Sequence, residues 1–374
     1  MGKANVRKIH SQQSRTLLCF AIVAASIGVS SSAGRPTATQ QARQALAPLH
    51  PIDAHAHVFQ SDPALTRMLE QWNLHIVDIL VVDDKGLTRR PLDQQRAAAL
   101  AFIHSARGHA SLCTTFDPFR LSQPDFTKTT IDQLNQDFAN GAIAVKVWKN
   151  IGMELKDGHG NYVMVDDPRL RPIFQDIAVH NKTLIAHQAE PDVAWKPDSK
   201  ALDTSYYAEH PEWDMSKVPG APSKAAVLAS RDQLLAQNPR LRVVGAHLGS
   251  MESDVDLVAE RLDRYPNFAV DTAARVPHLT IQPRPKVRAF LIKYQDRVLY
   301  GTDTDIMRKG DVNPSIADWQ KQLAEDWRYF ATADTFNYDG HMIQGLQLPL
   351  PVLRKLYHDN AVHWIPGLAN GGVR

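Results

Sequence analysis

Two histidines one residue apart, His55 and His57, are the first side chains in the sequence that could do chemistry together. In a β-strand, residues i and i+2 point to the same side, so both imidazoles would project from one face. Neutral imidazole nitrogens are ligands for divalent metals such as Zn²⁺. Taken alone, however, the pair is more typical of two histidines in a protein core.

Three further polar residues each follow a short apolar segment. His187 comes after residues 183–186, His247 after residues 243–246 and Asp303 after residues 299–302. A buried polar group needs a partner, so this repetition is hard to explain by core packing. If the segments are strands that end at one common edge, the five side chains can meet and hold one metal ion.

The elements that would position these residues are eight β-like segments that alternate with amphipathic helical stretches. Strict alternation predicts parallel strands joined by crossover helices. Eight units predict an α/β fold of the (β/α)8 TIM-barrel type, in which the carboxyl ends of the strands form the active-site face. A doubly wound open sheet is the alternative, but no glycine-rich phosphate-binding turn follows the first strand. The expected strands are 51–59, 76–82, 110–116, 142–148, 183–187, 242–248, 267–273 and 297–303, and clear helical patterns cover 92–107, 129–138, 224–237 and 255–264.

Two connections are longer than the roughly 2–6 residues usual after a barrel strand. Residues 149–168 follow the fourth strand and contain Asp157-Gly158, which is typical of a hairpin turn. Residues 188–222 follow the fifth strand and are rich in proline and aromatic residues. Both would lie at the active-site face as a lid or pocket wall, with an oligomer contact as the alternative.

The chain resembles the amidohydrolase-related branch of the amidohydrolase superfamily over about residues 50–366. The resemblance is carried by an ordered set of motifs: IDAHAH, AVKVWKN, the two strand-terminal histidines, YGTD and LRKLYHDNA. It implies a TIM-barrel enzyme with one divalent metal, usually zinc. The branch includes aminocarboxymuconate semialdehyde decarboxylase as well as lactone and amide hydrolases. By position, the implied metal ligands are His55, His57, His187 and Asp303, and the implied catalytic group is His247.

The chemistry of these residue types agrees with the resemblance. Zinc lowers the pKa of its water to roughly 7, Asp303 can take the proton from that water, and His247 can donate a hydrogen bond to the developing oxyanion. A role for His247 as a fifth ligand or a structural histidine stays open. Lys146 should face the barrel interior, where it could contact substrate, be carbamylated or pair with a carboxylate such as Asp53. Arg275 could clamp a substrate carboxylate or form a lid salt bridge.

The first 33 residues read as a secretory signal, with four cations, an apolar run at 17–29 and small residues up to Ala33. The run is too short for the roughly 20 residues that span a bilayer, so we expect cleavage and no membrane insertion afterwards. Residues 34–50 are expected to be a linker, and residues 51–374 the catalytic domain. Cleavage would leave Cys113 as the sole cysteine, without a disulfide partner.

Composition excludes several classes of protein. The 374 residues are 44% hydrophobic and 22% charged, which is ordinary for a globular chain. Beyond residue 33 the charges nearly balance, with 38 cations and 40 acids, so there is no electrostatic footprint for nucleic acid. The expected partner is a small molecule, and a homo-oligomer remains open.

The sequence therefore predicts an exported, periplasmic metal-dependent hydrolase that acts on an amide, lactone or ester. The alternatives are a metal-dependent nonoxidative decarboxylase and a noncatalytic metal-binding protein of the envelope.

Overall fold

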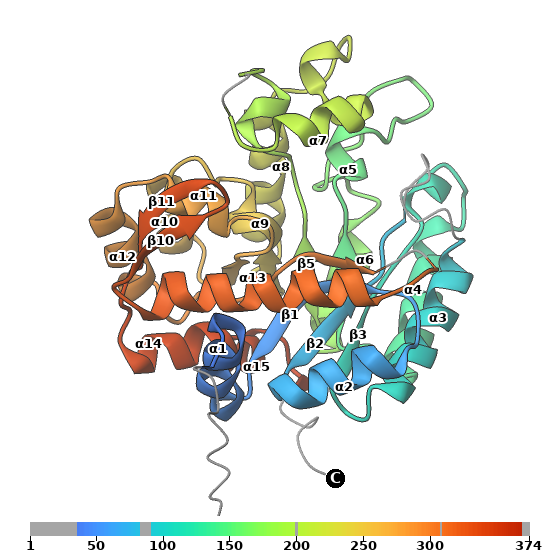
Figure 1. Ribbon diagram of the computed structural model, residues 1–374. Coiled ribbons are helices and arrows are strands. Elements are labelled where there is room, and N and C mark those ends of the chain that lie inside the picture. Colours follow the sequence, from blue (N-terminus) through green and yellow to red (C-terminus); the bar gives the residue numbers. More distant parts are fainter. Residues whose placement is uncertain (1–35, 83–90, 199–200, 307–308, 369–374) are drawn as a thin grey trace, which may run out of the picture. The chain divides into compact units, whose positions relative to one another are not determined.

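The computed structural model describes residues 36–82, 91–198, 201–306 and 309–368. Within these ranges, nine parallel strands form one sheet whose order follows the chain from β1 to β8, with β9 paired to β1 (Figure 1). The strands are β1 (Ile52–Val58), β2 (His75–Ile79), β3 (Ala110–Thr115), β4 (Ala144–Val147), β5 (Thr183–Ala186), β6 (Arg242–Gly245), β7 (Phe268–Asp271), β8 (Val298–Leu299) and β9 (Thr304–Ile306).

The last two strands are two pieces of one barrel strand that closes the sheet. β8 pairs with β7 and β9 pairs with β1. Between them, Ala54 N donates to Tyr300 O at 2.9 Å and Asp303 N donates to His55 O at 2.8 Å. The (β/α)8 prediction is confirmed. The expected continuous strand over 297–303 is interrupted, because Asp303 takes a left-handed conformation with φ of 67°.

A helix follows each barrel strand and covers the outside of the sheet (Figure 1). None of the helices in the described ranges is both long and apolar enough to cross a membrane. The crossover helices are α2 (Pro63–Trp72), α3 (Leu92–Ser105), α4 (Phe126–Ala139), α6 (Arg171–Val179), α8 (Lys224–Gln237), α10 (Val255–Arg264), α12 (Arg284–Lys293) and α13 (Asn313–Ala331). The additional elements include α9 (Ala246–Gly249), α11 (Val276–Thr280), α14 (Leu350–Arg354) and the hairpin of β10 (Thr335–Tyr338) and β11 (His341–Gln344).

Apolar side chains fill the lower part of the barrel, away from the carboxyl ends of its strands. One buried cluster joins strand residues such as Val77, Ile185 and Leu299 to residues of α15 (Asn360–Trp364) and the chain after it. Asn360 Nδ2 donates to Val298 O at 2.7 Å, so α15 is tied to the start of a barrel strand. The polar residues predicted to do chemistry are thereby restricted to the opposite end.

The segment expected to be a linker differs from that expectation in its described part. Residues 38–46 form α1 (Ala38–Leu46), which packs against α13. The reason lies in two local patterns: Thr37 and Gln40 form a capping box, and Ala42 and Leu46 lie four residues apart on one buried face. The expected signal, residues 1–33, lies outside the described residues.

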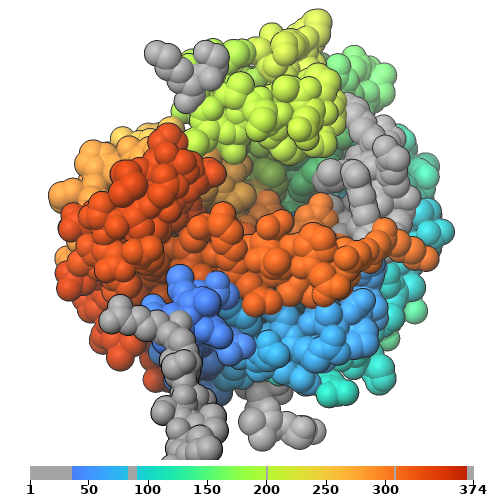
Figure 2. All heavy atoms as spheres, viewed as in Figure 1, coloured from blue at the N-terminus to red at the C-terminus, as the bar shows by residue number. Residues whose placement is uncertain are grey.

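The two long connections are present where the sequence predicts them. Residues 148–170 join β4 to α6 and contain α5 (Asn150–Met153) and a hairpin-like turn, in which Val163 N donates to Leu155 O at 2.9 Å. Residues 187–223 join β5 to α8 and contain α7 (Thr204–Glu209). We call the described part of residues 192–222 the lid segment. Its yellow-green atoms project at the top of the view in Figure 2, above α13.

Candidate metal centre

The alternation of β1 turns both histidines of the opening motif toward the barrel mouth. Their ring centroids lie 5.3 Å apart. His55 Nδ1 is 2.9 Å from Asp271 Oδ2, and His57 Nδ1 is 2.7 Å from the carbonyl oxygen of Ile79. Each Nδ1 donates to its oxygen, so each Nε2 carries the lone pair that a metal ligand needs.

Asp303 completes a group of possible metal ligands with these two rings. Its Oδ1 lies 3.4 Å from the Nε2 atoms of both His55 and His57. Among the described residues, the ligand atoms of these three side chains lie within 4.8 Å of one another. Burial alone would raise the pKa of Asp303, but His247 and then the rings of His57 and His55 hold that pKa well below its usual range. The carboxylate form, which binds metals, is therefore favoured.

The support for Asp303 comes from the start of β1. Thr302 N donates to Asp53 Oδ1 at 3.0 Å, and Trp319 Nε1 of α13 donates to Asp53 Oδ2 at 3.2 Å. A Cβ atom on Gly301 would lie 3.0 Å from the Cβ of His55, so the close approach of these two strands leaves little room for a side chain. Buried Asp53 thus connects β1 to Thr302, the residue before Asp303, and to α13.

His187 follows β5 and reaches the same mouth, but it lies outside the three-residue group. Its ring centroid is 4.2 Å from that of His247. His187 Nε2 is buried and has no hydrogen-bond partner in the described structure, and Glu190 Oε1 is 3.8 Å away. An unpartnered buried nitrogen is costly, and a bound metal would satisfy it. The position of this atom therefore agrees with the role of metal ligand that the family resemblance implies for His187.

His247 lies on a strained turn directly after β6, where His247 and Leu248 have φ of 59° and 55°. Its backbone N donates to Asp271 Oδ1 at 2.8 Å, and its Nδ1 is 2.9 Å from the carbonyl oxygen of Ala273. Burial lowers the pKa of His247 to about 3. In the neutral ring Nδ1 carries the proton, so Nε2 is an acceptor and could donate to an oxyanion only after protonation.

Asp271 is a site residue that the motif analysis missed. It ends β7, and its two carboxylate oxygens hold the ring of His55 and the backbone of His247. Asp271 could have been found by the pattern that identified Asp303, namely an acidic residue at the end of an apolar strand segment.

Lys146 faces the mouth from β4, as the strand alternation predicts. Its Nζ lies 3.0 Å from His55 Nε2, and burial lowers the pKa of its ammonium group. The suggested pairing with Asp53 is wrong, because Asp53 binds Thr302 and Trp319 instead. Substrate contact and carbamylation both remain compatible with this position.

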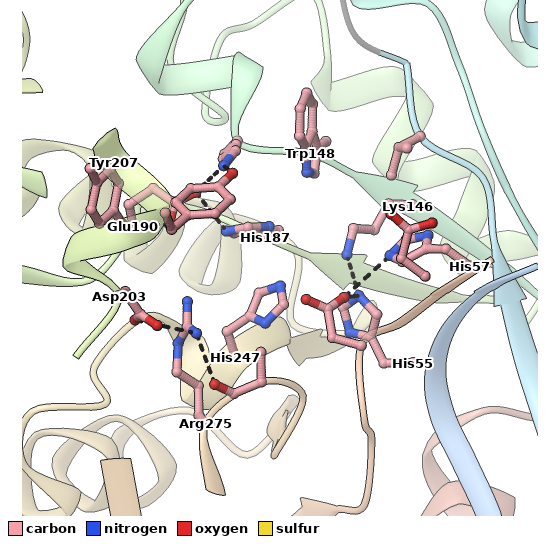
Figure 3. Close-up of a pocket in the computed structure, with 16 residues that line it drawn as sticks. His55, His57, Lys146, Trp148, His187, Glu190, Asp203, Tyr207, His247 and Arg275 are labelled. Atoms are coloured by element: carbon pink, nitrogen blue, oxygen red, sulfur yellow. Dashed lines mark hydrogen bonds and ion pairs between the residues drawn. The ribbon is translucent and has the colours of Figure 1, made fainter. Parts of the chain in front are cut away.

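The candidate ligands open into a pocket of about 250 Å³ whose walls come partly from the two long connections. Figure 3 shows His55, His57 and Lys146 on one side and Arg275, Asp203 and Tyr207 on the other. The pocket-wall interpretation of these connections therefore agrees with the structure. Other residues that line the pocket are Trp148, Lys149, Glu190, Tyr206 and Asp305.

A buried cation in this wall also escaped the sequence analysis. Lys149 Nζ pairs with Glu190 Oε1 and donates to the hydroxyl oxygen of Tyr206 at 2.8 Å. It also lies 4.4 Å from the ring centroid of Trp213. Tyr207 donates to Glu190 Oε2 at 2.9 Å. These contacts tie the lid segment to the ends of β4 and β5.

Arg275 is part of the opposite wall and is buried. Its Nη1 donates to the carbonyl oxygen of Ala274 at 2.9 Å and lies 3.8 Å from Asp203 Oδ2 of the lid segment. Its Nε has no hydrogen-bond partner in the described structure. Of the two expected roles, a lid salt bridge is present, and a substrate clamp stays a prediction.

Several solved structures resemble the chain at low sequence identity. None of the curated proteins matches the chain. Among solved structures, an amidohydrolase II is 16% identical, with a TM-score of 0.49 and coverage of 84% of this chain and 99% of that one. A 2,6-dihydroxybenzoate decarboxylase is 13% identical, with a TM-score of 0.48 and coverage of 84% and 98%. A probable 2-pyrone-4,6-dicarboxylic acid hydrolase from Acinetobacter baumannii is 13% identical, with a TM-score of 0.45 and coverage of 84% and 99%.

The identities and TM-scores of these structures are too low to carry an argument about the reaction. The sequence model of the amidohydrolase family, in contrast, matches residues 52–366, from the first residue of β1 to beyond α15. That range includes every candidate ligand and confirms the resemblance drawn from the motifs. The chain therefore belongs to the amidohydrolase family, and it is an enzyme of that family.

Proposed function

We propose that the chain is an exported metal-dependent hydrolase that cleaves an amide, lactone or ester bond in a small molecule. The observation that carries this proposal is the convergence of His55 Nε2, His57 Nε2 and Asp303 Oδ1 at a pocket mouth. Because neighbouring oxygens hold the Nδ1 atoms of both rings, the two Nε2 ligand atoms are oriented before any metal binds.

The proposed ligands are His55, His57, His187 and Asp303, with Zn²⁺ as the expected metal. Three imidazoles and one carboxylate form a donor set that suits zinc, and the unpartnered Nε2 of His187 agrees with a fourth ligand. When bound, such a metal supplies a Lewis acid that polarises a carbonyl and makes water acidic enough to attack at neutral pH.

The chain's own residues would handle the proton. Asp303 faces the histidine rings as a carboxylate and can accept the proton of an attacking water. His247 presents an unprotonated Nε2 to the pocket, because its Nδ1 donates to Ala273 O. We therefore refine its expected role: His247 takes over from Asp303 the proton of the attacking water and then, as the imidazolium, donates that proton to the developing oxyanion or the leaving group.

The pocket suits a small substrate with a flat or apolar part and an acidic group. Its volume of about 250 Å³ and the aromatic walls of Trp148, Tyr206 and Tyr207 restrict the size and favour planar groups. Arg275 is the proposed contact for a substrate carboxylate, and Lys146 is a second proposed substrate contact beside the ligands.

A decarboxylase is the second candidate, and one observation favours it. Lys146 Nζ lies 3.0 Å from His55 Nε2, so a cation is available beside the proposed metal position, where it can hold a carboxylate rather than a carbonyl group. The same ligands would then serve carbon–carbon bond cleavage with release of carbon dioxide.

The test is a substrate screen with purified, zinc-loaded protein. Panels of lactones, amides, esters and aromatic carboxylates are incubated with the enzyme while carbon dioxide release is monitored in parallel. We expect hydrolysis in the first three panels without carbon dioxide. Carbon dioxide release from the fourth panel would replace the hydrolase by the decarboxylase, and zinc-independent turnover would contradict both.

We also propose that residues 1–33 direct export to the periplasm and are cleaved, so that the mature chain begins at or near Gly34. The basic start, short apolar run and small residues before Gly34 support this. Mass spectrometry of protein recovered from the cell envelope should give that N-terminus, and intact Met1 in cytosolic material would refute it.

A further inference from the structure

Asp203 occupies an unusual position at the beginning of the lid helix. It is the N-cap residue of α7, where an aspartate usually accepts hydrogen bonds from the first backbone N–H groups of the helix. Here its side chain makes no such bond, and its backbone is left-handed, with φ of 64°. The carboxylate therefore does not cap the backbone N–H groups of α7. Asp203 lines the candidate active-site pocket instead.

The carboxylate faces two buried groups on the barrel. Asp203 Oδ2 lies 3.3 Å from His278 Nε2 and 3.8 Å from Arg275 Nη1. The Arg275 contact is longer than a hydrogen bond, and Arg275 Nε and His278 Nδ1 have no hydrogen-bond partner in the described structure. The side chains of Arg275 and His278 are 8% and 9% exposed. Each of these two buried side chains thus contacts Asp203 and keeps one nitrogen without a partner.

Lys149, another buried cation of the pocket wall, is bound quite differently. Lys149 has Glu190 as a close ion-pair partner, the hydroxyl of Tyr206 as a hydrogen-bond acceptor and the ring of Trp213 beside it. The ammonium group of Lys149 is therefore paired and hydrogen-bonded within the chain. Arg275, in contrast, lines the pocket with hydrogen-bonding capacity left, because its Nε has no partner in the described structure.

Asp203 carries a negative charge in this position. Burial alone would raise its pKa, but contact with His278 and the charge of Arg275 lower that pKa below its usual range. An anion that arrives in the pocket would compete for the same two groups. The displaced carboxylate would have other donors nearby, because the backbone N–H groups at the start of α7 donate no hydrogen bond to it at present.

We propose that Asp203 is an internal counter-ion that occupies the anion position of Arg275 and His278, and that the carboxylate of the substrate displaces it. The proposal rests on the hydrolase or decarboxylase function proposed above and narrows its substrates to those with a carboxylate distant from the reacting bond. Two-point hydrogen bonding by the guanidinium would favour a carboxylate over a neutral amide. Asp203 would thus be a specificity-determining residue that excludes anions too weakly bound to displace it.

The test is an equilibrium binding measurement that does not depend on turnover. Benzoate, and benzamide as its neutral analogue, are titrated into the zinc-loaded enzyme and followed by ligand-observed NMR. In Asp203→Asn the competing negative charge is absent, so we expect benzoate to bind about tenfold more tightly while benzamide is unchanged. Arg275→Met should weaken benzoate binding by at least about tenfold, because the two-point contact is lost. Arg275→Gln is a second variant in case the first fails to fold.

Asp305→Asn is the matched control, because Asp305 also lines the pocket, whereas the carboxylate paired with Arg275 in the described structure is that of Asp203. If this variant tightens benzoate binding as much as Asp203→Asn does, the effect is general electrostatics and the proposal is wrong. The proposal is likewise overturned if Asp203→Asn gives no gain, whether or not the wild type binds benzoate. It is overturned too if Arg275→Met and Arg275→Gln, both folded, bind benzoate normally.

Failure of this proposal and failure of the proposed function give different results. If the substrate screen finds no hydrolysis or decarboxylation but the binding pattern appears, the counter-ion role stands and the reaction assignment fails. If turnover is found but Asp203→Asn leaves both benzoate binding and the KM of carboxylate substrates unchanged, the counter-ion role fails alone.

Discussion

The two halves of the pocket are built on different supports. The ligand half, with His55, His57 and Asp303, lies on strand ends and is oriented by groups that also belong to strands or follow them directly. The lid half, with Tyr206 and Asp203, lies on a connection and is held by side-chain ion pairs and aromatic contacts. The difference suggests that the chemistry is fixed by the barrel, whereas substrate choice is decided by the lid segment.

The largest effect should come from removing the strand-borne ligands. In the double variant His55→Ala, His57→Ala, the proposed metal loses two of its four ligands, so metal content should fall from about one per chain to near zero. Activity should fall by more than the roughly 10- to 100-fold typical for loss of a residue that only orients a ligand. Metal analysis beside turnover measures both, with the exposed His180→Ala as a control.

Equal metal content in the wild type and the double variant would overturn the ligand assignment. A reproducible two metals per chain in the wild type would instead favour a carbamylated Lys146 that bridges them.

Within the same half, His247→Asn and His187→Asn should separate a catalytic group from a ligand. His247→Asn should keep the metal and lose about 10²- to 10³-fold in kcat, as is typical for loss of one group that stabilises the oxyanion. His187→Asn should lower metal content together with activity, because it removes a ligand. If His247→Asn also empties the site, His247 is a ligand, and if it remains fully active, Asp303 alone must carry the proton.

For the lid half, Glu190→Gln should affect stability rather than metal content. The change leaves Lys149 buried without its carboxylate, and breaking a buried pair costs about 3–5 kcal/mol. Denaturant unfolding should show this loss while metal stoichiometry stays near that of the wild type. The double variant Lys149→Met, Glu190→Gln should recover most of the stability. Metal loss in Glu190→Gln would mean that the two halves are not independent.

The smallest effect should be a pH dependence beneath the ligand half. Asp326 of α13 is fully buried and accepts hydrogen bonds from Tyr300 at 2.8 Å and Tyr338 at 2.6 Å. Burial raises its pKa to about 7, and nearby Glu325 and Asp53 add to the rise. Because the folded pKa exceeds the unfolded value of 3.8, the protonated form favours folding.

This contribution is complete below about pH 4 and is lost as the pH rises toward 7. Relative to Asp326→Asn, which does not titrate, the wild type should therefore lose stability across that interval, by at most about 4 kcal/mol. Urea unfolding of both proteins at several pH values gives the difference. Parallel pH profiles for the two proteins would contradict a raised pKa at Asp326.

The sequence by itself determined the barrel and the positions of its candidate ligands. Alternation along β1 places His55 and His57 on one face, and each of His187, His247 and Asp303 follows the end of its own apolar strand segment. These inferences need only the period of a strand and the rule that parallel strands end at one edge. The capping box at Thr37 and Gln40 was equally local, so α1 could have been predicted from the sequence.

Only the tertiary structure decided which side chains pair across the mouth. Lys149 with Glu190 and Asp203 with Arg275 join residues 41 and 72 positions apart on different connections. No sequence period relates such residues. Likewise, Asp53 accepts hydrogen bonds from Thr302 and Trp319 and does not pair with Lys146, because the last strand closes the barrel beside β1. The physical reason is that hydrogen bonds and ion pairs depend on distances of a few ångströms, which are set by barrel closure and by the path of the long connections.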